Sequence, residues 1–130
     1  METKTQESKM KPLEPLRQLY LSEVFICIGK EEAQSVYKTF GFEDTLDFDD
    51  SVDATTYHIE GDRIIIYFSK KIKKIRKTEQ AALIAHEAYH ASQMLKSNIR
   101  ENERAEETTA YLIQYLVRQS MKKLKKQSKK

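Results

Sequence analysis

Residues 78–96 read TEQAALIAHEAYHASQMLK, a stretch with helical character throughout. Within it His86 and His90 stand four residues apart, which places their imidazoles one turn apart on the same face of a helix. Two imidazoles that converge in this way can hold one metal ion, and Glu87 between them can reach a water molecule at that ion. The spacing therefore predicts a metal site carried by a helix.

Apolar residues continue the helical pattern on both sides of this motif. The pattern predicts one helix over residues 78–96, with Thr78 as its N-cap and a break at Ser97 and Asn98. Because apolar groups surround the histidines, we expect the motif to face the protein interior. The expected inner surface consists of Leu83, Ile84, His86, Glu87, His90 and Met94.

The composition favours one globular domain. The chain has 130 residues, of which 39% are hydrophobic and 33% charged, so a core can form without disulfides. Cys27, the only cysteine, lies in an apolar run and is expected to be a small buried hydrophobe, which excludes a cysteine-rich zinc finger. The start has no signal-peptide pattern and no apolar run is long enough to span a bilayer, so we expect a cytoplasmic protein without membrane contact.

Charge is gathered in runs, although the net charge is only +3. Residues 43–53 are acidic and are expected to form a loop, whereas residues 70–77 and 122–130 are basic. Basic runs are usually solvated faces or tails, and contact with nucleic acid is the alternative interpretation. We expect a disordered arm over residues 1–11, a single domain over 12–121 and a lysine-rich tail over 122–130 that does not pack.

Strand and helix patterns alternate along the chain, which indicates an α+β protein. Residues 54–59 and 63–69 predict a hairpin across the turn at 60–62, and the second strand should be covered on both faces. Residues 23–28 fit either a strand or the continuation of a short helix over 13–21. Further helices are expected over 30–40, closed by Gly41, and over 100–123, with a core stripe of Ala110, Ile113, Leu116 and Val117.

A catalytic zinc site usually takes three protein ligands, so the histidine pair needs a third. The helix after the motif offers several glutamates. We prefer Glu107, because it shares a helical face with Ala110 and Tyr111 at the start of the apolar stripe. Glu103, one turn earlier, is a candidate to hydrogen-bond a ligating imidazole. Glu106 is the rival ligand, and spacing alone does not separate it from Glu107.

The order of a strand hairpin, an HExxH helix and a later helix with Glu-x-x-Ala-Tyr resembles the gluzincin branch of zinc metallopeptidases. In size the chain is similar to the smallest members, the minigluzincins, and it also resembles small zincin-like proteins encoded by phages and prophages. The third histidine of the metzincin motif is absent. The resemblance covers about residues 55–117 and is carried by His86, Glu87, His90 and Ala91, and then by Glu107, Ala110 and Tyr111.

This resemblance implies a zincin-like fold, in which a small antiparallel sheet or hairpin packs on the HExxH helix and on a following antiparallel helix. It implies one Zn²⁺ ion per chain, held by His86, His90 and Glu107. It also implies peptide-bond hydrolysis with Glu87 as the general base. The substrate would be a peptide or protein lying along an edge strand, which the hairpin would supply.

The resemblance leaves the electrophile and the function class open. Tyr111 is the expected group for holding the oxyanion, with Tyr89 and His58 as alternatives. His58, on a strand, is otherwise expected to be partly exposed or hydrogen-bonded rather than a ligand. A phage-type structural or regulatory binding protein, whose zinc stabilises the fold and whose partners are other proteins of an assembly, is the second function. It would lie in the host cytoplasm or the virion. Nucleic-acid binding through the lysine runs is the third.

Overall fold

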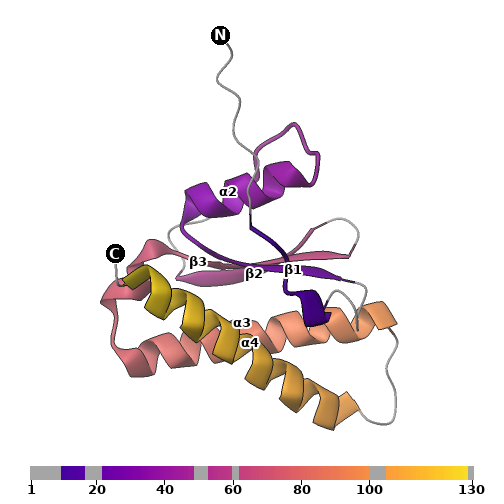
Figure 1. The fold of residues 1–130 in the computed structure, drawn as a ribbon, viewed down its shortest axis with the longest axis vertical. Coiled ribbons are helices and arrows are strands. Elements are labelled where there is room, and N and C mark those ends of the chain that lie inside the picture. Colours follow the sequence, from indigo (N-terminus) through magenta and orange to yellow (C-terminus); the bar gives the residue numbers. More distant parts are fainter. Residues whose placement is uncertain (1–9, 17–21, 49–52, 60–61, 100–104, 129–130) are drawn as a thin grey trace.

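The computed structural model describes residues 10–16, 22–48, 53–59, 62–99 and 105–128. These residues form the predicted α+β protein, with a three-stranded sheet and helices on both of its faces (Figure 1). None of the described helices is long and apolar enough to cross a bilayer. In chain order the elements are β1 (Glu23–Ile28), α2 (Lys30–Thr39), β2 (Ala54–Ile59), β3 (Arg63–Phe68), the 3-10 helix η1 (Lys70–Lys74), α3 (Lys77–Ile99) and α4 (Ala105–Ser128).

β3 is the central strand of the sheet, whose order is β1-β3-β2. β2 and β3 form the predicted antiparallel hairpin, with Thr56 opposite Ile66. Residues 23–28 are a strand, and this strand pairs with β3 in parallel. The sheet is therefore mixed, and the expectation of a purely antiparallel sheet is wrong for β1. A parallel pair needs a crossover connection, and the chain between β1 and β3 provides one that includes α2.

The alternation of side chains along β3 divides the core into two layers. Ile64, Ile66 and Phe68 join a cluster that includes α3 and α4. Ile65 and Tyr67 point to the other face and join a cluster with α2. Figure 1 shows this arrangement, with α2 on one side of the sheet and the two long helices on the other. β3 is thus covered on both faces, as its continuous apolar sequence predicts.

Cys27 lies on β1, in the layer that faces α2, and is completely buried, as predicted. Burial disfavours the thiolate and raises the pKa of this thiol well above its ordinary value, and the nearby Glu32 carboxylate acts in the same direction. The group therefore stays protonated at neutral pH and serves as a small hydrophobe rather than as a nucleophile or metal ligand.

α3 is longer than its sequence predicts at both ends. It begins at Lys77, one residue before the predicted N-cap, and it continues through Ser97 and Asn98 to Ile99. Its buried face carries Ile84, Ala88, Ala91 and Leu95, at spacings of three and four residues.

The predicted inner surface of α3 is correct for Ile84 and Glu87 but wrong for His86 and His90, which are exposed. Ala88 and Ala91 face the sheet instead, and their small side chains let α3 pack closely against the sheet. The histidines therefore lie at the border between the packed face and solvent.

α4 runs back along α3 in the opposite direction, as expected (Figure 1). Its buried residues are Leu112, Leu116, Ser120 and Leu124, so the predicted stripe is correct at Leu116 and wrong at Ala110, which is exposed.

The lysine-rich residues at the end of the chain are also better packed than predicted. α4 continues to Ser128, and Leu124 is only 4% exposed. The Lys123 Nζ lies 2.7 Å from Glu32 Oε1 on α2. The predicted tail therefore does not begin at Lys122, because Leu124, two residues further along, reaches the core. Met10 accepts a 3.6 Å hydrogen bond from Lys123 at its sulfur, while residues 1–9 of the predicted arm lie outside the described residues.

Candidate metal centre

The two histidines of α3 converge as their spacing predicts. The Nε2 atoms of His86 and His90 lie 3.1 Å apart, and the ring planes meet at 75° with centroids 4.7 Å apart. Two nitrogens bound to one tetrahedral zinc, each at about 2.0–2.1 Å, lie roughly 3.3 Å from each other. The observed separation is therefore close to that of two imidazoles sharing one ion.

Glu87 differs from the histidines beside it in being buried. The side chain of His86 is 66% exposed, whereas that of Glu87 is 6% exposed. Successive residues of a helix point about 100° apart, so a helix that packs one side against a sheet can bury Glu87 and leave its neighbour in solvent. A carboxylate buried in this way needs a hydrogen-bond partner.

Thr56 of β2 provides that partner. Its hydroxyl donates a 2.8 Å hydrogen bond to Glu87 Oε1 and also lies 3.2 Å from the Glu87 carbonyl oxygen. The shorter contact, to the charged acceptor, is the stronger of the two. The other carboxylate oxygen, Oε2, lies 4.0 Å from His86 Nε2. One oxygen of Glu87 is therefore held by the sheet, and the other is left on the side of the histidines.

The site opens beside an edge of the sheet. Within the described part of the chain β2 pairs only with β3, so its outer edge is unpaired. Two hollows of about 510 and 280 Å³ lie between β2 and α3, and both are lined by Ala54, His86 and Glu87. The smaller one also reaches Thr56 and His90. Together they place the motif at the side of a strand that can accept another strand.

The third metal ligand is not among the residues whose side chains are described. Over that part of the chain, no three His, Cys, Asp or Glu side chains are close enough together to hold a metal ion. Glu103 lies outside the described residues, and Glu106 and Glu107 lie in α4 with side chains that are not described. Glu107 as third ligand stays a prediction. Ala110 and Tyr111, which share its predicted helical face, are exposed and do not face the core.

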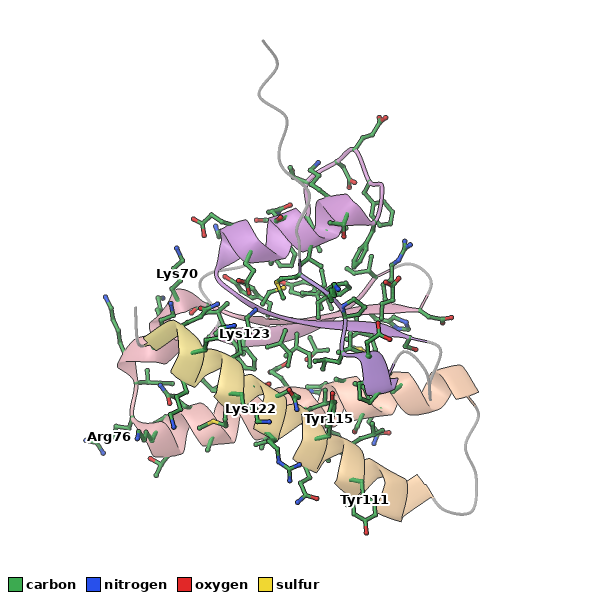
Figure 2. All side chains as sticks on the ribbon, viewed as in Figure 1. Lys70, Arg76, Tyr111, Tyr115, Lys122 and Lys123 are labelled. Atoms are coloured by element: carbon green, nitrogen blue, oxygen red, sulfur yellow. The ribbon has the colours of Figure 1, made fainter. Side chains whose placement is uncertain are left out.

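The three candidate electrophiles are placed differently. Tyr111 is 63% exposed and lines neither hollow, and Figure 2 shows its side chain pointing away from the sheet. His58 is exposed on β2, as expected, and also lines neither hollow. Tyr89 is half-exposed, with its ring centroid 6.0 Å from that of His90. Of the three candidate electrophiles, only Tyr89 therefore lies next to a predicted metal ligand, His90.

Thr56 is the site residue that the sequence prediction missed. A signal for it exists in the strand pattern, because Ala54, Thr56 and His58 alternate onto one face of β2. The pattern does not indicate that α3 crosses this face at Glu87. That contact joins residues 31 positions apart, and only the packing of α3 on the hairpin brings them together.

No family model, curated protein or solved structure matches this chain. Three features of the described residues point to a function: the converging imidazoles, the buried carboxylate beside them and the strand edge along the site that no described strand pairs with.

Proposed function

We propose that the protein is a zinc-dependent metallopeptidase of the gluzincin type, with a zincin-like arrangement of sheet and helix. The observation that carries this proposal is the 3.1 Å approach of the His86 and His90 Nε2 atoms, with a buried Glu87 beside them. This approach is within hydrogen-bond distance for two imidazoles of which one carries a proton on Nε2, and it is also close to the separation of two nitrogens bound to one zinc ion. The residues present therefore fit a zinc ion, with His86 and His90 as two ligands and Glu107 as the proposed third.

Zinc, when bound, supplies a Lewis acid that polarises a carbonyl group and acidifies water. The chain's own part in hydrolysis is proton transfer and positioning. Glu87 Oε2 accepts a proton from the attacking water as the new carbon–oxygen bond forms. It then donates that proton to the amine nitrogen as the carbon–nitrogen bond breaks. The Thr56 hydroxyl holds Oε1 during both transfers, so the carboxylate does not rotate away from the histidines.

The substrate we propose is a peptide segment in extended conformation. The outer edge of β2, which no described strand pairs with, offers backbone hydrogen-bonding groups to such a segment, in the mode of strand addition. A segment added there lies along the two hollows that His86 and Glu87 line. This placement presents a backbone carbonyl to the motif without requiring a deep cleft, which suits a chain of this size.

The first prediction concerns metal content. The wild-type chain, purified without chelator, should contain about one zinc ion per chain, and His86→Ala should contain almost none, because one imidazole cannot replace two. Elemental analysis by mass spectrometry after exhaustive dialysis measures this. Gln93→Ala, an exposed position on the same helix, is the matched control and should retain the metal. A wild-type protein that binds no divalent zinc at micromolar concentrations would exclude the site.

The second prediction concerns Thr56. Thr56→Val keeps the shape of the side chain but removes its hydrogen bond to Glu87, which for a charged acceptor contributes about 1.5–3 kcal/mol. We expect kcat to fall by roughly ten- to a hundredfold, with zinc content and KM little changed. Thr56→Ser, which keeps the hydroxyl, should recover most of the rate. Equal activity of the valine and serine variants would contradict the positioning role.

A further inference from the structure

A further hollow, separate from the two at the metal centre, lies between the start of α3 and the C-terminal half of α4. Its volume is about 630 Å³. Five cationic side chains line it, two from the segment before and at the start of α3 and three from α4. These are Lys73, Lys77, Arg118, Lys122 and Lys125. We call this hollow the cationic groove.

The fold creates this groove from two basic runs that are far apart in the sequence. In Figure 1 the C-terminal end of α4 lies beside η1 and the start of α3. On α4 the three cations recur every three to four residues, so Arg118, Lys122 and Lys125 form one stripe. Among the described residues none that lines the groove is acidic, and no ion pair involves any of the five cations. Their charge is therefore not neutralised within this part of the chain.

The floor of the groove is apolar. Ile75, Met121 and Leu124 line it between the cations, and all three belong to the core cluster of the sheet and the long helices or pack against it. Gln80, at the base, is occupied by a 2.6 Å hydrogen bond from its side-chain nitrogen to the Ile72 carbonyl. A methionine at such a surface adapts to differently shaped apolar side chains. The groove thus offers both apolar contact and positive charge to one ligand.

We propose that the cationic groove binds an acidic amphipathic peptide segment of a partner protein. Apolar side chains of the segment would occupy the floor at Met121 and Leu124. Carboxylates on its flanks would pair with Lys77 on one wall and Arg118 and Lys122 on the other. A helix with acidic residues on both sides of an apolar stripe has this complementarity. The groove is distinct from the edge of β2, so this inference does not depend on the proposed hydrolysis.

The floor is what favours a peptide over nucleic acid. A nucleic acid would engage the lysines through its phosphates and would be insensitive to the aliphatic floor. Single strands are held mainly by stacking on aromatic side chains, and none of the described residues that line the groove is aromatic. The combination of aliphatic floor and cationic walls therefore matches an acidic peptide better than a polyphosphate.

Binding to the full chain can be measured by fluorescence anisotropy with a fluorescein-labelled peptide of repeating Glu-Leu-Leu-Glu-Glu-Leu-Ala sequence. We expect saturable binding that weakens as salt is added. Lys77→Glu combined with Arg118→Glu should lower the affinity by at least about tenfold, since like charges now face the peptide. Lys74→Glu combined with Arg76→Glu changes the net charge equally but outside the groove, and Figure 2 shows Arg76 pointing away from the molecule. This control should lower the affinity less than about threefold.

Changes to the floor distinguish the peptide from other anionic partners. Met121→Gln should weaken peptide binding about three- to tenfold. A probe peptide with serine in place of leucine should bind equally poorly to the wild-type protein and to Met121→Gln. The proposal is overturned if duplex DNA, oligodeoxythymidylate or phosphatidylserine vesicles bind more tightly than the peptide and are insensitive to Met121→Gln. It is also overturned if the groove variant and the matched control lose affinity equally, or if the groove variant abolishes a dimer of this chain.

Discussion

Glu87→Gln should reduce peptide-bond hydrolysis by about 10²–10⁴-fold while the protein keeps its zinc. Glutamine has nearly the shape of glutamate and can still accept the Thr56 hydrogen bond at its carbonyl oxygen. Its amide nitrogen, however, cannot take a proton from water. The variant therefore removes the proton transfer and leaves the histidine pair in place. Hydrolysis can be followed with fluorescein-labelled casein and a library of internally quenched peptides, and zinc by elemental analysis of the same sample.

This substitution also separates the enzyme from the second function considered for the chain. If wild type cleaves none of these substrates while binding zinc, and unfolds at a lower temperature once zinc is removed, the ion stabilises the fold of a binding protein. If wild type cleaves and Glu87→Gln cleaves equally well, another residue is the base. Glu43→Gln is a suitable control, because Glu43 is exposed and lines neither hollow of the site. It should leave zinc content unchanged.

The local parts of the candidate site could be predicted from the sequence. The four-residue spacing of His86 and His90 fixes their common face in any α-helix, and the structure confirms that their Nε2 atoms converge. The hairpin could also be predicted, because Ala54–Ile59 and Arg63–Phe68 are rich in β-branched and aromatic residues and flank a turn. Both features depend on residues that are neighbours in the chain, and local patterns report such neighbours directly.

The parts that depend on packing could not be predicted in the same way. Whether Ser97 and Asn98 end α3 depends on the burial of Leu95, two residues before Ser97, which outweighs their weak helix propensity. The pairing of β1 with β3 and the approach of Thr56 to Glu87 join segments separated by about thirty to forty residues. The sequence predicts a tail at the end of α4 because lysines dominate it, although Leu124 in that stretch is buried and brings its turn to the core.

A large loss of folding stability is expected from truncating buried side chains of β3, the strand on which α3 packs. Ile66→Ala and Ile65→Ala each remove a fully buried side chain from the central strand, and each should lower the free energy of unfolding by about 2–5 kcal/mol. The two side chains lie on opposite faces of β3. Ile66 packs in the cluster with Ala88 and Ala91 of α3, whereas Ile65 packs in the cluster with α2. Urea denaturation followed by circular dichroism measures both losses.

The two variants should differ in function, although they are alike in stability. Ile66 lies directly opposite Thr56 in the sheet, so a cavity at Ile66 lets β2 and α3 shift relative to each other at the Thr56–Glu87 hydrogen bond. We expect Ile66→Ala to lower kcat about tenfold or more at a temperature where both variants are folded, because a displacement near 1 Å is enough to misplace a catalytic group. Ile65→Ala should keep the wild-type rate. If the two variants lose activity in proportion to stability alone, the sheet holds α3 in place but does not position Glu87, and the coupling through Thr56 is refuted.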